Sequence, residues 1–302
     1  MPGDHMLFGA LGFSYAGFEG AARGMSRRGA FSANLGDNMQ TLAVRHLYRQ
    51  IGVPDACVVR IDRDRLASYD GPEVMLPMNG CFYDWHFPLS PRIKPVFIGF
   101  QLRRAAVAAI APHLAGQGPI GCRDAHSASL LQEAGLEAEV TGCLTFSLPR
   151  REATPRKGRV LIVHGSGSGA LPGLALKKMP RRLLMQAEFV SQRREVTTCP
   201  LTEAQMDEQE QIAAALLHDY QTEARLVITP LHHVAAPCLA AGIPVVVIRR
   251  EWDERFSFMD RLLPIHLSPF FDQVDWDPAP VDLTELRAAQ LARFRAALAP
   301  WL

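Results

Sequence analysis

Two spacings of hydrophobic residues alternate along the chain, and together they predict an α/β protein. Short apolar runs closed by glycine, proline or polar turns are typical of buried strands, whereas apolar residues three or four positions apart indicate helices. In the N-terminal half we expect strands at residues 57–61, 74–78, 95–100 and 138–141. We expect helices at residues 37–51, 103–114 and 124–134, the first capped by Asp37 and ended by Gly52.

The same alternation resumes in the C-terminal half. We expect strands at residues 159–163, 187–191, 226–229 and 244–248, and helices at 203–220 and 235–241. The tail, 283–302, has helical spacing and should pack back onto a domain. A basic, proline-rich stretch at 148–159 separates the halves, so we predict domains at 1–150 and 151–302. Alternating strands and helices favour two doubly wound, Rossmann-like domains with parallel sheets that face a cleft.

Composition and charge narrow the class of protein. The 302 residues carry a formal net charge of +1 and are 48% hydrophobic, which is typical of a globular protein and leaves no basic domain for nucleic acid. The basic run at 150–159 is interpreted as a solvated linker, with a membrane-surface patch as the alternative. No apolar run reaches about 18 residues, so we expect no transmembrane segment. Six cysteines without a C-x-x-C pair favour free thiols and a cytoplasmic location.

Two adjacent histidines, His232 and His233, follow the predicted strand at 226–229. Ligands bind beyond the carboxyl ends of strands in open α/β sheets, so this turn is a candidate site. The pair is interpreted as a general acid and base, with backbone hydrogen bonding as the alternative. Because adjacent imidazoles on a turn point in different directions, we expect no shared metal ion there.

Three further turns place polar residues at strand ends. The segment SANLGDNMQ carries Asn34, Gly36 and Asp37, and its backbone N–H groups can hold an anion where a glycine lets the ligand approach. The alternative is simple capping of the helix by Asp37.

In IGCRD, Asp124 is suited to cap a helix, which leaves Arg123 free to bind a carboxylate or phosphate. The alternative is that Arg123 pairs with a neighbouring acid. Asn79 follows another strand and is either a ligand or part of a plain turn. The glycine-rich loop at 165–169 has the spacing G-x-G-x-G, so a loop of the cleft is favoured over a dinucleotide site.

Several of these segments, taken in order, resemble motifs of the polysaccharide pyruvyl transferase family. They are ANLGDNMQTLA, MNGCF, PVFIGF, IGCRD with EVTGCLTFSL, and LVITPLHHVAAPCLAAGIPVV. The resemblance implies a two-domain fold like that of GT-B glycosyltransferases. It also implies an exopolysaccharide-biosynthesis enzyme that transfers a pyruvyl group from phosphoenolpyruvate to sugar hydroxyls of a glycan. Phosphoenolpyruvate is then a donor substrate, and no cofactor is expected.

That chemistry needs cations to hold the donor, an acid to protonate its enol carbon, and a base to take the sugar proton. By resemblance, His233 matches the family histidine, Arg123 the central arginine, and Asn34, Gly36 and Asp37 the first turn. We therefore expect His233 and Asp37 to be catalytic. The remaining candidates are expected to bind substrate: Asn34, Gly36, Asn79, Arg123, Asp124, His232 and Arg249.

The chain departs from the family pattern at two positions. Leu231 stands where the family usually has an arginine, and Gln192 where a histidine is expected. Losing one charged contact to an anion costs on the order of 2–5 kcal/mol. Three explanations follow: His232 supplies the charge, Arg249 or Arg250 replaces it, or the donor is not phosphoenolpyruvate.

Two other functions remain open at this point. One is a GT-B-like glycosyltransferase that uses a nucleotide sugar, with Glu251 and Trp252 as candidates to hold the nucleoside. The other is a non-catalytic glycan-binding relative of the family.

Overall fold

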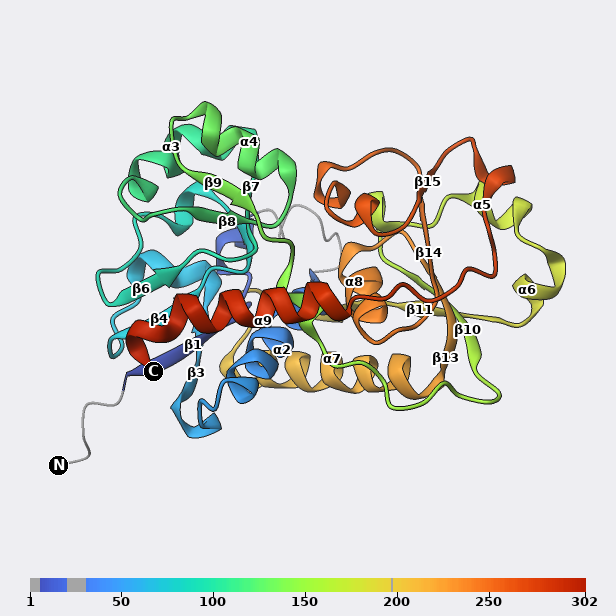
Figure 1. Cartoon of the computed structure of the whole chain (residues 1–302), viewed down its shortest axis with the longest axis horizontal. Helices are drawn as coiled ribbons and strands as arrows, with labels where there is room; N and C mark the ends of the chain where they lie inside the picture. The colour runs from blue at the N-terminus through green and yellow to red at the C-terminus, as the bar shows by residue number, and fades with distance from the viewer. Residues whose placement is uncertain (1–5, 21–30, 197) are drawn as a thin grey trace.

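Residues 6–20, 31–196 and 198–302 are described by the computed structural model, which is an α/β protein with several parallel sheets (Figure 1). The strands of the N-terminal half are β1 (Leu7–Gly12), β3 (Val58–Asp62), β4 (Val74–Pro77), β5 (Gly80–Phe82), β6 (Ile93–Val96), β7 (Phe100–Leu102), β8 (Ile120–Cys122) and β9 (Ala138–Val140). Those of the C-terminal half are β10 (Arg159–His164), β11 (Ala187–Ser191), β13 (Ala224–Thr229), β14 (Val245–Arg249) and β15 (Ile265–Leu267). A separate antiparallel pair joins β2 (Phe31–Asn34) to β12 (Arg193–Val196).

The longer helices are α2 (Leu35–Gln50), α3 (Arg104–Leu114), α4 (Ala125–Glu133), α7 (Glu203–Glu223), α8 (His232–Ala240) and α9 (Thr284–Leu298), with α5 (Gly173–Lys178) and α6 (Arg181–Met185) shorter. Single 3₁₀ turns fill the connections: η1 (Ala16–Phe18), η2 (Asp55–Cys57), η3 (Arg63–Ser68), η4 (Asp84–His86), η5 (Leu144–Ser147), η6 (Gly167–Gly169), η7 (Glu254–Phe256), η8 (Met259–Arg261), η9 (Phe271–Gln273) and η10 (Ala299–Trp301). Among the described residues, no helix combines the length and apolar character needed to cross a membrane.

Two four-stranded parallel sheets, β3-β1-β4-β6 and β5-β7-β8-β9, make up the N-terminal half. They continue into each other, because the amide of Met78 donates to the carbonyl of Val96 and that of Gly80 to Gly99. The single strand predicted at 95–100 is therefore two strands. Gly99 interrupts it with a φ of +73°, a left-handed conformation that glycine adopts readily.

The C-terminal half has one five-stranded parallel sheet in the order β11-β10-β13-β14-β15. In both halves the first strand of the sheet lies inside it, and the chain proceeds to one side of that strand and then to the other. Such a reversal opens a crevice at the carboxyl ends of the two strands beside it. The crevices lie between β1 and β4 and between β10 and β13.

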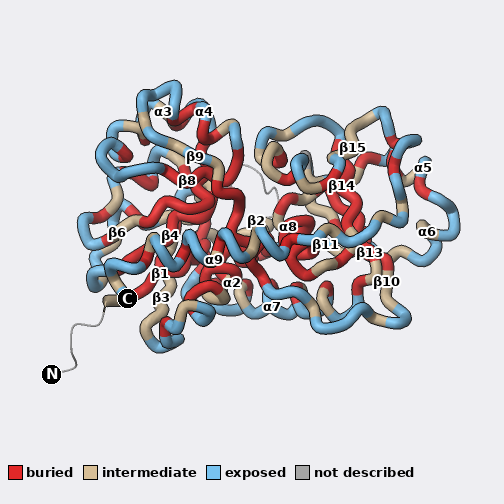
Figure 2. The backbone as a smooth tube through the Cα atoms, in the orientation of Figure 1, coloured by how far each residue is buried: buried red, intermediate tan, exposed pale blue. Residues whose placement is uncertain are grey.

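One hydrophobic core is shared by the two halves. Side chains alternate along β10, with Leu161 and Val163 in this shared core and Val160 and Ile162 in a second core on the other face. The shared core takes in α2, α8 and α9, while α3 and α4 cover the opposite face of the N-terminal sheets. Buried residues run along the strands and through α8 between the halves (Figure 2).

The C-terminal helix returns to the N-terminal half, as its apolar spacing predicts. In Figure 1, α9 runs from the C-terminal half back across the first strands. Phe294 of α9 meets Tyr48 of α2 edge-on, with ring centroids 5.4 Å apart, and both rings are fully buried. The covering helix of the first half thus comes from the end of the chain.

Helix α2 begins two residues before the predicted start, and Asn34 rather than Asp37 caps it. The Asn34 carboxamide oxygen accepts a hydrogen bond from the amide of Gly36 at 3.1 Å. Asp37 therefore lies within the first turn. The prediction for Asp124 is confirmed, since its carboxylate accepts from the amide of Ser127 at 2.8 Å. Helix α8 begins at His232, three residues before the predicted start.

The hydroxyl of Tyr48 provides a test of the shared core. It donates to the carbonyl of Gly9 in β1 at 2.8 Å, in a fully buried position. We expect Tyr48→Phe to lower the free energy of unfolding by about 1–2 kcal/mol, because the buried carbonyl loses its side-chain donor. Urea unfolding measures this change. Tyr69→Phe is the matched control: its hydroxyl donates to Pro72 at 2.8 Å on the surface, and an equal loss in both variants would contradict the prediction.

Candidate functional site

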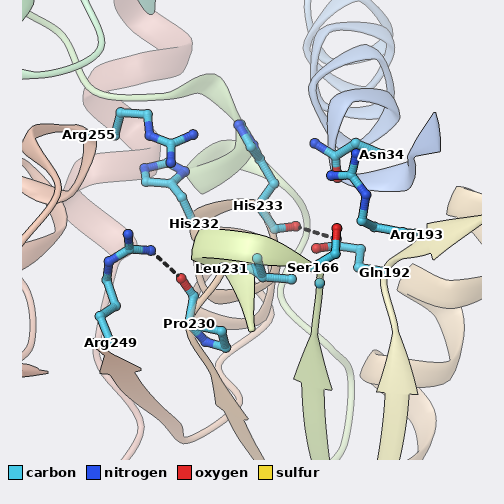
Figure 3. Close-up of a pocket in the computed structure, with 12 residues that line it drawn as sticks. Asn34, Ser166, Gln192, Arg193, Pro230, Leu231, His232, His233, Arg249 and Arg255 are labelled. Atoms are coloured by element: carbon cyan, nitrogen blue, oxygen red, sulfur yellow. Dashed lines mark hydrogen bonds between the residues drawn. The ribbon is translucent and has the colours of Figure 1, made fainter. Parts of the chain in front are cut away.

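Two adjoining open cavities lie at the carboxyl ends of the sheets, and together they are called the cleft. The smaller, about 580 Å³, lies between β10 and β13 at the start of α8, and the larger, about 880 Å³, extends into the N-terminal half. Both are lined by Asn34, Arg193, His233 and Arg255. The residues of the smaller cavity are drawn in Figure 3.

His233 lies in the first turn of α8 and faces Arg123. The Arg123 guanidinium (Nη1) is 3.2 Å from Nε2 of His233. Burial, with the positive charge of Arg123, holds the pKa of His233 well below its usual range. The imidazole is therefore neutral, so Nε2 accepts from Arg123 and Nδ1 carries the proton. Nδ1 is buried and has no hydrogen-bond partner among the described residues, which leaves one polar atom available to a ligand.

The first turns of α2 and α8 touch at Gly36. A Cβ atom at this position would lie 2.8 Å from Cβ of His233, closer than real Cβ contacts. Gln192 stabilises the same junction. Its side-chain amide donates to the backbone carbonyl of His233 at 2.9 Å (Figure 3), and its backbone carbonyl accepts from the amide of Leu35 at 3.1 Å. Gly36 therefore makes room for His233, and Gln192 joins the two halves.

Arg123 is buried and held from two sides. One Nη donates to the side-chain oxygen of Gln101, and Nε lies 4.0 Å from the Asp124 carboxylate. Asp124 caps α4 and lines neither cavity, so it positions Arg123 rather than reaching a ligand. Nη1 reaches His233, which brings the two residues matched to the family motifs into contact.

Asp37 lines the larger cavity between two hydrogen-bond donors. The Tyr15 hydroxyl lies 3.2 Å from one carboxylate oxygen, and the Asn34 side-chain amide donates to the other at 3.0 Å. Burial raises the pKa of Asp37, and the positive charge of Arg63 partly opposes this. Tyr15 has a left-handed backbone, with φ 62°, which is rare outside glycine and concentrates at functional sites.

The cleft is strongly cationic. Five arginines line the larger cavity: Arg63, Arg103, Arg123, Arg193 and Arg255. Arg249 joins two of them in the smaller cavity, and Asp37 is the carboxylate among the described lining residues. Such a surface attracts small anions.

None of the three residues expected to replace the charge missing at Leu231 is suited to do so. His232 is buried against Phe146 and Phe256, and burial, with the charges of its neighbours, lowers its pKa well below the usual range, so it supplies no charge. Arg249 donates to Pro230, Glu251 and Asp253, so all its nitrogens are engaged.

Arg250 is exposed and lines neither cavity. Arg255, which pairs with Asp253, lines both cavities and extends beside His232 (Figure 3).

Asn79 does not reach the cleft, contrary to the prediction. It is 1% exposed, and its side-chain oxygen accepts from the amide of Leu144 at 3.2 Å. Because the sheet continues past Met78 into β5, the expected turn is an inward-facing break within the sheet. Asn79 therefore holds η5 against the sheet.

Sequence reasoning missed Tyr15, Arg63, Arg103, Arg193 and Arg255. Arg193 follows Gln192 at the end of β11, and its guanidinium binds the hydroxyl and carbonyl of Ser32 at 2.9 Å. Its position after a strand was a usable signal. Arg63 and Arg103 directly follow β3 and β7 and offered the same signal, whereas Arg255 and Tyr15 occupy connections whose course depends on the fold.

Three side chains, two of them buried and one half-buried, have the chemistry of metal ligands. The ligand atoms of Cys143, His232 and His233 lie within 4.8 Å of one another. The positive charges of Arg123 and Arg255, which disfavour protonation of both histidines, disfavour a dication in the same way. The surroundings therefore fit an anion better than a metal ion.

These features define an α/β protein with a cationic cleft at the carboxyl ends of its sheets. A family model described as polysaccharide pyruvyl transferase matches residues 93–251, more than half of the chain. The chain belongs to this family, which confirms the resemblance inferred from its sequence. The matched region includes Arg123 and His233 and excludes the first turn of α2.

No curated protein sequence matches the chain. Among solved structures, it is similar to accessory secretory protein 1, 2 and 3 of Streptococcus pneumoniae, with 13% identity and a TM-score of 0.40. The similarity covers 78% of this chain and 52% of the other, so the present chain spans about half the length of that protein.

The neutral state of His232 predicts a pH dependence of stability. Below about pH 6.5 the imidazole of His232 is protonated in the unfolded protein but stays neutral in the folded protein. The free energy of unfolding therefore falls as the pH decreases. Because burial and neighbouring charges hold the pKa of His232 low, we expect His232→Leu to weaken this dependence by up to about 1.4 kcal/mol per pH unit. Urea unfolding between roughly pH 5.5 and 7.5 measures the slopes.

The matched control is His218→Leu, at an exposed position on α7, which should leave the slope unchanged. Equal slopes in the wild type and in His232→Leu would contradict the neutral assignment.

Proposed function

We propose that the protein transfers a pyruvyl group from phosphoenolpyruvate to two hydroxyls of a sugar in a cell-surface glycan and forms a cyclic ketal. The observation that carries this proposal is that Asp37, Arg123 and His233 line one cavity whose other charged groups are arginines. Family membership supports the reaction class. An acid, a base and cations are the groups that this reaction requires.

The donor's phosphate and carboxylate fit the arginine-rich end of the cleft. Arg123, Arg193 and Arg255 supply guanidinium groups, which bind such anions in a bidentate manner. The start of α8 adds a positive dipole end. Leu231 occupies the N-cap position and makes no side-chain hydrogen bond to the first turn, so its side chain does not compete there with an anionic ligand. The leucine thereby favours an anion even without a charge of its own.

Two side chains, Asp37 and His233, account for every proton transfer of the proposed reaction. Asp37, whose pKa is raised by burial, protonates the methylene carbon of the donor. Nε2 of neutral His233, freed when Arg123 turns to the donor, takes the proton of the first hydroxyl, and that oxygen bonds to C2. The C2–O bond to phosphate then breaks, and the phosphate leaves with the proton of His233. The second hydroxyl attacks C2 and returns a proton to Asp37. The products are the ketal and inorganic phosphate, and both side chains regain their starting states.

We further propose a GT-B-like arrangement of two domains, 1–150 and 151–302, with the donor and acceptor meeting at their junction. The carboxyl ends of the sheets of both halves border the cleft. The core shared through α2, α8 and α9 supports little relative motion of the two parts. We also propose the cytoplasmic location expected from the cysteine content, because such a location keeps thiols reduced.

Donor binding is testable without an acceptor. We expect millimolar phosphoenolpyruvate to raise the melting temperature, and Arg255→Gln to weaken its affinity at least about tenfold, because one of the charged contacts is lost. Arg123→Ala should remove the shift. Arg250→Gln is the matched control, because this arginine is exposed outside the cleft. No shift in the wild type, or equal affinity in both glutamine variants, would count against the proposal.

The acid role of Asp37 predicts a selective loss of rate. We expect Asp37→Asn to lower kcat by about 10²–10⁴-fold while the phosphoenolpyruvate affinity changes little, since the amide has no transferable proton. Phosphate release with an acceptor glycan measures the rate. Asp219→Asn, on the exposed side of α7, should retain activity. Full activity in Asp37→Asn would refute the assignment, and absence of turnover in the wild type would favour a non-catalytic glycan-binding protein.

A glycosyltransferase that uses a nucleotide sugar is the second candidate. Gly165, Ser166 and Gly169 line the smaller cavity beside α8, where a diphosphate also fits. Glu251 and Trp252, expected to hold the nucleoside in that case, line neither cavity. Thermal protection by UDP- or GDP-sugars without protection by phosphoenolpyruvate would select this function.

A further inference from the structure

Three aromatic rings form a cluster at the N-terminal end of the larger cavity, here called the aromatic platform: Phe18, Tyr83 and Trp85. Tyr83 and Trp85 stack with centroids 4.5 Å apart and planes 2° from parallel. Phe18 meets both edge-on, at 5.3 and 5.4 Å. Phe18 and Tyr83 line the cavity.

Trp85 remains 40% exposed although it is held in place. A Cβ atom at Gly17 would lie 2.2 Å from its indole nitrogen, so the backbone of η1 presses against the ring. A large aromatic side chain usually buries most of its surface in a folded protein. An exposed tryptophan stacked on a residue of the cavity wall is typical of a ligand surface.

A network of buried polar side chains, formed by His86, Asp64 and Arg63, holds the aromatic platform in place. The amide of Tyr83 donates to Nδ1 of His86 at 3.1 Å, so the other imidazole nitrogen carries the proton toward Asp64, also at 3.1 Å. Asp64 in turn binds Arg63, whose guanidinium lies over the Phe18 ring at 5.7 Å. Because His86 and Arg63 are buried, the rings are fixed before any ligand arrives.

The platform adjoins the catalytic end of the cleft. Tyr15, which contacts Asp37 at 3.2 Å, has its ring centroid 6.5 Å from that of Phe18. The arginines shared by both cavities, Arg193 and Arg255, belong to the opposite, C-terminal part of the cleft. A donor held by those arginines and a ligand on the platform therefore approach Asp37 and His233 from different sides.

We propose that the aromatic platform is the subsite for a pyranose ring of the acceptor glycan, which rests on the proposed function. A pyranose has one face of C–H groups, which packs on an aromatic ring, and an edge of hydroxyls, which need polar partners. The exposed surface of Trp85 offers the first. Arg103, which is exposed and lines the same cavity as Tyr83, offers donors for the second.

The platform is tested by binding, without turnover. We expect lactose, cellobiose or β-1,4-mannobiose, titrated by calorimetry up to about 20 mM, to bind the intact protein. Trp85→Ala should weaken that binding at least about tenfold. Trp252→Ala is the matched control, because Trp252 is 38% exposed and lies outside both cavities. The phosphoenolpyruvate thermal shift should be the same in both variants.

If Trp85→Ala unfolds, the conservative variant Trp85→Phe still tests the proposal. The bound disaccharide should change tryptophan emission in the wild type and in Trp252→Phe, and the change should vanish in Trp85→Phe. No binding of any of the three disaccharides, equal binding in the Trp85 and Trp252 variants, or uridine binding that depends on Trp85 would overturn the proposal. Sugar binding without a phosphoenolpyruvate shift would instead overturn the proposed function and leave the subsite standing.

Discussion

The contact between the first turns of α2 and α8 determines the rest of the cleft. The backbone at Gly36 lies so close to His233 that a methyl group would not fit between them. This approach brings Asp37, which belongs to α2, and His233, which belongs to α8, into one cavity although they are far apart in the chain. Gln192 reinforces it with hydrogen bonds to both helices. Loss of this contact would separate Asp37 from His233 while leaving each sheet intact.

The charges of the cleft are arranged before a ligand binds. Arg123 is held by Gln101 and Asp124, Arg255 by Asp253, and Arg193 by Ser32. These contacts reduce the side-chain entropy that an anion would otherwise have to fix on binding. Burial, reinforced by the charges of Arg123 and Arg255, keeps both histidines neutral, so two of the arginines proposed to bind the donor also help keep His233 in the state that a base requires.

Local sequence patterns identified most strands and helices, because their apolar spacing reports which faces are buried. They also identified Arg123, which directly follows β8, and His233, which lies in the turn after β13; both line the larger cavity. They failed at Asn79, because a break inside a continuing sheet has the same sequence features as a turn at its end. The strand before Arg193 marked it as a candidate, but its contact with Ser32 depends on the pairing of β12 with β2, which are more than 150 residues apart, and no local pattern reports such a pairing.

The pair Leu231–His232 shows how the chain accommodates an apolar residue where its family has an arginine. Leu231 packs toward the glycine loop, where a Cβ atom at Gly169 would lie 2.8 Å from its side chain. His232 turns into the core between Phe146 and Phe256, where a charged group would be unfavourable. Arg255 contributes charge to both cavities from η7 instead. Because Asp253 binds both Arg255 and Arg249, the position of this replacement charge depends on a carboxylate that itself never reaches the cleft.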